Sequence, residues 1–313
     1  MAKEKWLRGN IHTHTSESDG DSDAKSVVSW YRKHNYDFLV LTDHNHLTIL
    51  NYEKGRRKFK KPLMIPGEEV TAKIQEGSVP IHINGIGISR VVEPIDAEGI
   101  IPTIQANVDA IIEAGGIASI NHPNYKWALT KTDLSQVVGA SLLEIHGPAV
   151  CNDAGAPGYQ SAEQIWDSVL STGRVIFGVA VDDAHHYHDF DLKKLNPGRG
   201  WVMVRTKYIN AEAIIDSLAS GNFYSSTGVY LKELETSPSI ISLTIEQQYL
   251  EYYSTDSRKP IYITSFYGRK GQLLKEVVGI QASYKPSGNE QYVRATVNSS
   301  SGFKAWTQPV FIK

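Results

Sequence analysis

The sequence has a single cysteine, Cys151, among its 313 residues. One cysteine excludes an intramolecular disulfide framework and a zinc site built from cysteines. No apolar run is long enough to span a bilayer, and the N-terminal residues lack the basic and then apolar pattern of a secretory signal. These absences predict a cytoplasmic protein without a membrane partner, or a periplasmic or secreted one if a signal peptide has been removed.

An excess of charge of one sign is also missing. Lys and Arg together number 32 and Asp and Glu 34, so the formal net charge is -2. Because this balance offers no general surface for polyanions, we do not expect nucleic acid as a partner, although a local basic patch could still hold a phosphate group. Hydrophobic residues at 41% and charged residues at 21% are typical of a globular protein with a packed core.

Short apolar runs alternate with amphipathic segments as far as residue 221. We predict strands over residues 6–13, 37–42, 63–70, 81–88, 116–121, 141–145, 175–181 and 200–205. We predict helices over residues 24–34, 104–114, 162–172 and 211–220, the last with Asn210 as its N-cap and Gly221 as its stop. The alternation of strand and helix favours an α/β fold with a parallel sheet, either a barrel or a doubly wound sheet.

The pattern changes after Gly221. Residues 239–245, 260–267 and 291–298 alternate apolar and polar side chains and are separated by Gly, Ser and Pro, without a convincing helix. We therefore predict two domains, an α/β domain over residues 1–221 and a small antiparallel β module over residues 222–313. The module could cover the first domain, mediate a homo-oligomer or contact the substrate, and the sequence leaves these roles open.

Six of the eleven histidines lie near the ends of predicted strands. His12 and His14 end the first strand, and residues two apart on a strand point to the same face. The polar residues that follow at later strands are Asp19, Asp43, His44, Glu68, Glu69, His82, His122, Asp183 and His185. Most of them lie at the carboxyl end of a strand, where sites gather in parallel α/β proteins; His82 lies near the start of its run.

Imidazole and carboxylate groups in one cluster are ligands for zinc, manganese or iron. Ions held by such a cluster can lower the pKa of a bound water to near neutrality and supply hydroxide as a nucleophile. A lone His-x-His pair is common by chance, and an isolated Asp-His is often a cap or a turn. The recurrence of such motifs at successive strands, however, favours a metal-dependent hydrolase.

The ordered motifs resemble those of the polymerase-and-histidinol-phosphatase (PHP) superfamily over about residues 6–221. The resemblance rests on His12-x-His14, Asp19, Thr42-Asp43-His44, Gly67-x-Glu69, His82, Asn121-His122-Pro123 and Asp183-x-His185. Residues 67–71, 82–87 and 305–309 look like the carbaryl-hydrolase-like branch of that superfamily. The resemblance implies a distorted seven-stranded (β/α) barrel, similar to a TIM barrel, with a trinuclear metal centre and a following β module.

The resemblance also implies the ligand sets, and with them two to three divalent ions of zinc, manganese or iron per chain. One ion would be held by His12, His14, Glu69 and Asp183, a second by Glu69, His82 and His122, and a third by Asp19, His44 and His185. Spacing alone leaves Glu68 and Glu69 as alternatives. The family's Gly-x-Glu-Val order favours Glu69, and alternation along the strand would then turn Glu68 to the opposite side.

The function that we expect is a phosphoesterase that uses metal-bound hydroxide on a small anionic, phosphorylated substrate. The alternative is a carboxylic ester, carbamate or amide hydrolase of the carbaryl-hydrolase type. Among the catalytic residues, Asp43 or a neighbouring histidine, His44 or His185, would protonate the leaving group. A non-catalytic binding domain is disfavoured, because such a domain would be expected to lack some of the ligand motifs.

Three basic residues are candidates for substrate binding, namely Arg90, Lys126 and Arg199, because each follows or lies near a predicted strand end. A guanidinium or ammonium group there could hold a phosphoryl group. Charged residues are, however, more often part of a solvated face.

Overall fold

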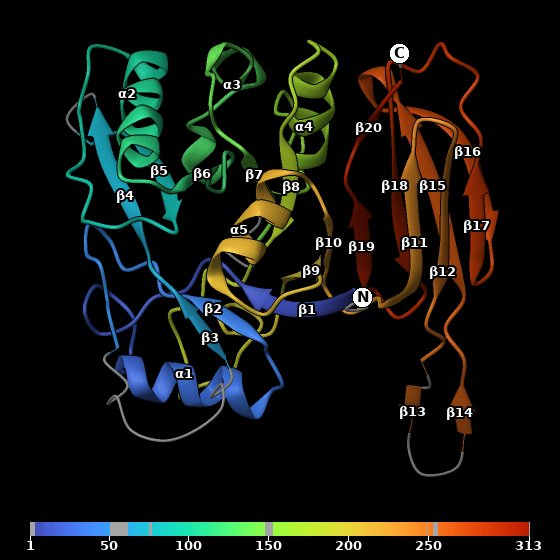
Figure 1. Ribbon diagram of the computed structural model, residues 1–313, viewed down its shortest axis with the longest axis horizontal. Coiled ribbons are helices and arrows are strands. Elements are labelled where there is room, and N and C mark those ends of the chain that lie inside the picture. Colours follow the sequence, from blue (N-terminus) through green and yellow to red (C-terminus); the bar gives the residue numbers. More distant parts are fainter. Residues whose placement is uncertain are drawn as a thin grey trace.

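The structure is a computed structural model that describes residues 4–50, 62–74, 77–147, 153–248, 250–252 and 256–312. Helices and strands alternate in its first part, and strands dominate its last part, which stands beside the first (Figure 1). Cys151 lies outside the described residues. In these ranges, no helix combines the length and the apolar character that crossing a membrane requires.

A five-stranded sheet comes from the middle of the chain, in the order β4-β5-β6-β7-β8. Its strands are β4 (Gly67–Ile74), β5 (Val79–Ile86), β6 (Ile117–Ile120), β7 (Leu142–His146) and β8 (Phe177–Ala180). Helices α2 (Ile100–Glu113), α3 (Lys131–Gln136) and α4 (Ala162–Leu170) follow its strands, and α2 and α4 pack against it (Figure 1). A short 3-10 turn, η1 (Tyr125–Trp127), follows β6.

A ten-stranded sheet combines strands from both ends of the chain, in the order β16-β15-β18-β19-β10-β9-β1-β2-β3, with β20 paired to β18. The first part of the chain contributes β1 (Lys5–Asn10), β2 (Phe38–Val40), β3 (Leu63–Ile65) and β9 (Trp201–Thr206). The last part contributes β10 (Phe223–Ser226), β15 (Tyr262–Gly268), β16 (Gln272–Val278), β18 (Tyr292–Ser299), β19 (Lys304–Thr307) and β20 (Val310–Phe311). One sheet therefore runs across the predicted domain boundary, and the division at residue 221 remains a prediction.

Two smaller sheets complete the last part of the chain. A three-stranded sheet contains β11 (Leu231–Ser237), β12 (Ile240–Ile245) and β17 (Gln281–Tyr284). A two-stranded sheet contains β13 (Leu250–Tyr252) and β14 (Asp256–Arg258), and the 3-10 turn η2 (Arg269–Gly271) connects β15 to β16. The predicted antiparallel character of this part is confirmed, because every pairing among these strands is antiparallel.

Polar caps fix where the remaining helices begin. The carboxylate of Asp23 accepts hydrogen bonds from two backbone N–H groups in the first turn of α1 (Ala24–Lys33). Asn210 caps α5 (Ala211–Ala219) through a 2.8 Å hydrogen bond from the N–H of Ala213, as the sequence predicts. Side-chain oxygens at these positions satisfy N–H groups that have no partner within the helix.

The prediction of a parallel sheet is correct only in part. The predicted strand over residues 63–70 is divided at Pro66 into β3 and β4, which belong to different sheets, because proline has no N–H to continue a ladder. Strands β4 and β5 are antiparallel, since the connection between Ile74 and Val79 is too short for a crossover helix. The fold is thus mixed α/β.

The strands of the described residues do not form one closed ladder. Hydrogen-bonded pairing stops between β3 and β4 and again between β8 and β9. Two isolated parallel bridges span these breaks on the side where β1, β2 and β8 end, one between Thr13 and Ala184 and the other between His44 and Glu69. The two sheets therefore meet where the histidine motifs lie.

A buried ion pair connects α4 to β18. The guanidinium of Arg294 donates hydrogen bonds of 2.7 Å and 2.6 Å to the two carboxylate oxygens of Asp167. Tyr292 adds a 2.8 Å hydrogen bond to the same carboxylate, and all three side chains are buried. Bidentate pairing of this kind fixes orientation as well as distance, so it holds the last part of the chain in place against α4.

Candidate metal centre

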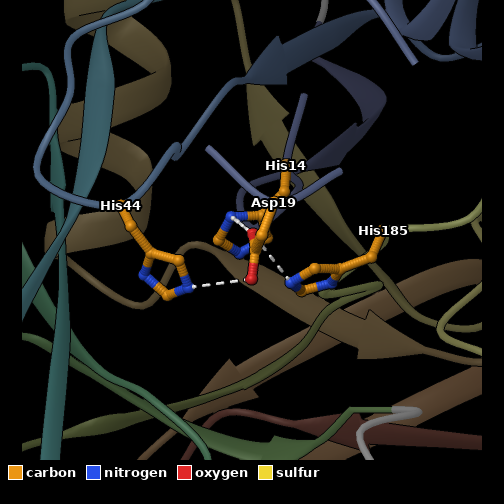
Figure 2. Close-up of side chains that lie close together, drawn as sticks. All are labelled: His14, Asp19, His44 and His185. Carbon is orange, nitrogen blue, oxygen red and sulfur yellow. Dashed lines mark ion pairs between the residues drawn. The ribbon is translucent and has the colours of Figure 1, made fainter. Parts of the chain in front are cut away.

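The candidate ligands come from both sheets and meet at the breaks between them. His12 and His14 follow β1, His44 follows β2, and Asp183 and His185 follow β8. Glu69 lies in β4, His82 in β5, and His122 directly after β6. Asp19 lies in the loop between β1 and α1, and Figure 2 shows its carboxylate between three imidazoles. The structure therefore brings together all nine residues that the resemblance implies as ligands.

Glu69 lies at the centre of the cluster. One oxygen, Oε1, lies 3.4 Å from His12 Nε2, 3.1 Å from His82 Nδ1 and 3.3 Å from His122 Nε2. The other, Oε2, lies 3.4 Å from His14 Nε2 and 2.9 Å from His44 Nδ1. Oε2 is buried and has no hydrogen-bond partner among the described residues. A buried carboxylate oxygen without a hydrogen bond is costly, so its surroundings fit a cation.

Gly67 allows β4 to approach its neighbours closely enough to place Glu69. A Cβ atom at Gly67 would lie 2.4 Å from a methyl carbon of Val40 on β2 and 2.8 Å from the carbonyl oxygen of Gly85 on β5. Such contacts are much shorter than van der Waals separations. The glycine two residues before the central carboxylate is therefore required by packing.

A second carboxylate, Asp183, faces the first pair of histidines. Its Oδ1 lies 3.1 Å from His12 Nε2 and 3.2 Å from His14 Nε2, and these two nitrogens lie 3.2 Å apart. Asp183 has a φ of 44°, a conformation that is uncommon for residues other than glycine and that gathers at functional sites. The strained backbone thus turns the carboxylate toward the imidazoles.

Asp19 forms the outer part of the cluster with three histidines (Figure 2). Its carboxylate oxygens lie 3.5 Å from His14 Nδ1, 3.5 Å from His44 Nε2 and 3.3 Å from His185 Nε2. The side chain of Asp19 is 54% exposed, whereas that of Glu69 is 1% exposed. The cluster therefore extends from a dry interior to the solvent.

Four sets of these residues have ligand atoms close enough together to hold a metal ion. They are His14 with Asp19, His44 and His185; His12 with His122 and Asp183; His12 with His14 and Glu69; and His44 with Glu69 and His82. The first contains the whole third set that the resemblance implies, with His14 added. The residues of the other two implied sets are divided differently among the remaining three groups, because His12 lies near both His14 and His122.

Electrostatic coupling perturbs the protonation of the cluster. Burial alone would lower the pKa of His12, but Asp183, Glu144 and Glu69 outweigh burial and raise this pKa well above its ordinary value. Burial would raise the pKa of Glu69, yet His82 and His12 hold that pKa well below its usual range. Burial also opposes protonation of His44, and its carboxylate neighbours nevertheless raise its pKa to about 10. Metal binding must displace protons from such imidazoles, so metal affinity should fall at low pH.

Glu144 contacts two of the candidate ligands, although the predicted site omits it. Its Oε1 lies 2.5 Å from His12 Nδ1, and its Oε2 accepts a 2.7 Å hydrogen bond from the backbone N–H of His122. A carboxylate behind a ligating histidine fixes its tautomer and orientation. The signal available in the sequence was its position near the end of β7, next to strands that end in ligands.

Two more polar side chains support ligands in a similar way. Asn121 donates a 2.7 Å hydrogen bond to Glu69 Oε1, and Thr71 Oγ1 lies 2.6 Å from His44 Nδ1. Both residues neighbour predicted ligand motifs, but their roles depend on contacts between strands that spacing along the chain does not reveal.

Glu68 and Asp43 lie outside the cluster of ligand atoms. Glu68 faces the other side of β4, where its Oε1 accepts a hydrogen bond from the N–H of Val92 and burial raises its pKa to about 7. The carboxylate of Asp43 accepts hydrogen bonds from Thr15, Ser18 and Thr48. These bonds hold the loop that carries Asp19, which favours a positioning role for Asp43 over proton donation.

The three predicted substrate contacts lie in different places. Lys126 lines a groove beside the cluster. Arg90 donates to the carbonyl of Glu113, and Arg199 to the carbonyl of Asp191, and neither lines a described cavity. Contact of Arg90 or Arg199 with a substrate remains a prediction.

The cluster opens into a cavity of about 150 Å³. Its lining consists of Asp19, His44, Glu69, His82, His122, Tyr125, Asp183, His185 and Leu195. The ring of Tyr125, which is 41% exposed, lies 5.3 Å from the ring of His122 and 6.0 Å from that of His82. The cavity thus has a polar floor and an aromatic wall at its mouth.

The chain matches known proteins only when it is compared with solved structures. No family model matches the chain, and no curated protein matches it. A two-domain protein from Bacteroides vulgatus, described as containing a predicted PHP-like metal-dependent phosphoesterase, superposes with a TM-score of 0.51 at 14% identity, over 98% of this chain and 96% of that one.

Two further solved structures overlap with smaller parts of the chain. A lesion-specific endonuclease from Pyrococcus furiosus matches with a TM-score of 0.43 and 13% identity, over 69% of this chain and 56% of that one. An amidohydrolase from Chromobacterium violaceum, with bound sulfate and no metal, matches with a TM-score of 0.38 and 14% identity, over 60% and 93%. At identities this low the comparisons show only a similarity of fold, and the chain shares the fold of the Bacteroides vulgatus protein over 98% of its length.

Proposed function

We propose that this protein is a metal-dependent hydrolase and, more specifically, a phosphoesterase acting on a small anionic substrate. The observation that carries the proposal is the convergence of five imidazoles on the two oxygens of Glu69, at distances of 2.9 to 3.4 Å. Buried charges of this kind need a compensating partner. The cluster also lines a cavity, so a ligand can reach it.

The donor set fits divalent metal ions. Imidazole nitrogens and carboxylate oxygens suit zinc, manganese or iron, and we expect two to three ions in the four overlapping sets. Bound divalent ions supply a Lewis acid for a phosphoryl oxygen and lower the pKa of coordinated water.

The surrounding residues prepare the imidazole nitrogens for this role. The contact of Glu144 with His12 Nδ1 places the ring proton there and leaves Nε2 as a lone pair facing Asp183 and Glu69. His185 Nδ1 lies 2.8 Å from the carbonyl oxygen of Asp183, which likewise leaves Nε2 facing Asp19. With the Nδ1 proton held in place, Nε2 is the nitrogen of each ring that gives up its proton to a metal ion, since burial is outweighed by neighbouring carboxylates, which raise the pKa of both His12 and His185.

A phosphoester fits this cavity better than a neutral ester does. Two or three bound dications would concentrate positive charge at the cluster, and a phosphoryl dianion is attracted to that charge more strongly than a neutral carbonyl. Tyr125 favours the alternative, a carboxylic ester, carbamate or amide hydrolase, because its exposed ring at the mouth could pack against an aryl group. That alternative corresponds to the carbaryl-hydrolase-like branch.

The architecture can be proposed in finer detail on the same basis. We propose that residues 1–221 form an opened, distorted (β/α) barrel, in which the two isolated bridges lie where the ladder pairing stops, and that residues 222–313 are the β module.

The formal net charge of -2 still argues for a small substrate and against nucleic acid.

The test is a substrate panel run with and without metal. After chelation and reloading with manganese or zinc, the protein is assayed with 4-nitrophenyl phosphate, bis(4-nitrophenyl) phosphate, 4-nitrophenyl acetate and a 4-nitrophenyl carbamate. Metal-dependent turnover of a phosphate with little turnover of the acetate and carbamate is expected. The reverse preference, together with no inhibition by phosphate or vanadate, would establish the alternative.

A pair of adjacent variants tests the assignment of the central carboxylate. Glu69→Gln should lower kcat/KM by at least about a hundredfold, because it removes the charge shared by five imidazoles. Glu68→Gln is the matched control and should change kcat/KM by less than about threefold, since Glu68 contacts Val92 on the other side of the strand. A larger loss in Glu68→Gln than in Glu69→Gln would overturn the assignment.

A further inference from the structure

A groove of about 700 Å³ adjoins the metal-binding cavity and shares Asp19, His44, His82 and Tyr125 with it. The rest of its lining is Asn45, Thr71, Lys73, Gly77, Pro80, Pro94, Asp96 and Lys126. Its volume lies within the range of about 300–1,000 Å³ that is typical of small-molecule sites, whereas the inner cavity of about 150 Å³ is smaller than that range. A substrate whose reacting group enters the inner cavity therefore has room to extend into the groove.

Strands β4 and β5 set the direction of the groove. Glu69, Thr71 and Lys73 alternate along β4, so they share one face of the strand. Across the ladder, His82 lies opposite Thr71, and Pro80 lies opposite Lys73. Because a strand rises about 3.3 Å per residue, the Cα of Lys73 lies about 13 Å along β4 from the Cα of Glu69. One side of the groove thus leads from the metal ligands to an ammonium group.

A second ammonium group comes from the other side of the groove. Lys126 lies in η1 with a φ of 51°, and its Nζ lies 5.5 Å from the ring centroid of Tyr125. In the part of the chain that the structure describes, Lys73 and Lys126 form no ion pair with a carboxylate. The carboxylate of Asp96 also lines the groove, but its Oδ1 accepts a 3.1 Å hydrogen bond from the backbone N–H of Lys73. Two cations are therefore available to a ligand.

We propose that the groove binds a second anionic group of the substrate through Lys73 and Lys126. The substrate class is then a phosphoester that carries another phosphoryl or carboxylate group several bonds away from the phosphorus that reacts. The inference rests on the proposed phosphoesterase function, since that function places the reacting group over the metal ligands. Because Lys73 and Lys126 line the groove and not the inner cavity, a second anion on the atom next to the ester oxygen would stay inside the inner cavity, away from the lining that these lysines form.

Binding of unreactive phosphonates to the metal-loaded protein tests the groove without catalysis. The probes are hexylphosphonate, 6-phosphonohexanoate and hexane-1,6-bisphosphonate, measured by calorimetry. We expect at least one of the two probes with a second anion to bind ten- to a hundredfold more tightly than hexylphosphonate. This factor corresponds to one charge-assisted hydrogen bond and is therefore the least that two lysines should contribute. Comparison of the two probes distinguishes a carboxylate from a second phosphoryl group.

Variants then locate the second anion. The double variant Lys73→Gln with Lys126→Gln should reduce the preference for the second anion to within about twofold, while Lys285→Gln, an exposed lysine after β17, should retain it. The inference is overturned if the wild type shows no preference, if the double variant keeps the preference, or if Lys285→Gln loses it equally.

Kinetics separate this inference from the proposed function. The kcat/KM ratio of hexane-1,6-diol bisphosphate to hexyl phosphate should exceed about ten in the wild type and fall in the double variant, mainly through KM. If neither phosphoester is hydrolysed but the bisphosphonate binds in a lysine-dependent manner, the proposed function fails and the groove retains its assignment as an anion site. If phosphoesters are hydrolysed with a ratio near one, the function stands and the inference is overturned.

Discussion

The substitution Glu144→Gln is expected to weaken metal binding while leaving the protein folded. Glutamine keeps the shape of the side chain but lacks its charge and one of its two acceptor oxygens. It therefore loses either the contact with His12 Nδ1 or the hydrogen bond from the N–H of His122. A hydrogen bond to a charged group contributes about 1.5–3 kcal/mol. This is about ten- to a hundredfold in metal affinity, the range found for residues behind metal ligands.

The assay is competition for zinc or manganese between the protein and a chromophoric chelator at fixed pH, with circular dichroism to verify the fold. Asp153→Asn is the matched control, because Asp153 also places a carboxylate beside an imidazole, at 3.1 Å from His146 Nδ1. Neither Asp153 nor His146 belongs to a candidate ligand set. The control should bind metal within about twofold of the wild type. Wild-type affinity in folded Glu144→Gln would refute the view that Glu144 orients His12.

Three further outcomes are expected. Exhaustive chelation should abolish hydrolysis, and manganese or zinc should restore it; full activity with metal shown to be absent would contradict a metal-dependent reaction. Asp167→Ala should lower the free energy of unfolding in urea by about 3–5 kcal/mol, because the buried Arg294 loses its bidentate partner and keeps only the 3.5 Å ion pair with Glu163, and a loss below about 1 kcal/mol would show that the pair contributes little. Burial alone would raise the pKa of Glu290, but hydrogen bonds from Ser287 and Tyr284 lower it to about 2, so its contribution to stability is full above about pH 4.5 and is lost as the pH falls toward 2. The stability difference between the wild type and Glu290→Gln should therefore shrink over this interval, and a difference that is constant with pH would rule out the assigned pKa.

Local patterns predicted the elements that carry the ligands. His12-x-His14 closes an apolar run, so the shared direction of both imidazoles could be inferred from spacing, although β1 ends at Asn10 and not at Thr13 as predicted. Spacing left Glu68 and Glu69 as alternatives, and the Gly-x-Glu-Val order of the family that the chain resembles favoured Glu69, which the structure places toward the histidines. The first inference depends only on neighbouring residues of one segment, whereas the second needed the resemblance.

Features that depend on pairing between distant strands were not predictable in this way. Glu144 lies 132 residues from His12, and nothing in its own segment indicates which histidine it contacts. The antiparallel β4–β5 pairing was missed because alternating strands and helices elsewhere suggested parallel connections. Asp43 stands beside His44 in a ligand motif, yet its hydrogen bonds to the loop after β1 decide its role. Sequence spacing located the candidate site, and tertiary contacts distinguish the candidate ligands from the residues that contact them.

The position of the candidate centre couples metal binding to the fold. Ladder pairing stops between β3 and β4 and between β8 and β9, and only isolated bridges at Thr13–Ala184 and His44–Glu69 join the two sheets among the described residues at the carboxyl ends of β1, β2 and β8. The ligand atoms come from both sides of these breaks, since His12 and His14 follow β1 of the large sheet whereas Glu69 belongs to β4 of the small one. An ion held between them would add a further connection between the sheets to the backbone hydrogen bonds of these bridges and to the apolar core that the two sheets share. Because binding free energy at such a junction is also folding free energy, the residues that serve the chemistry would also hold the two sheets together.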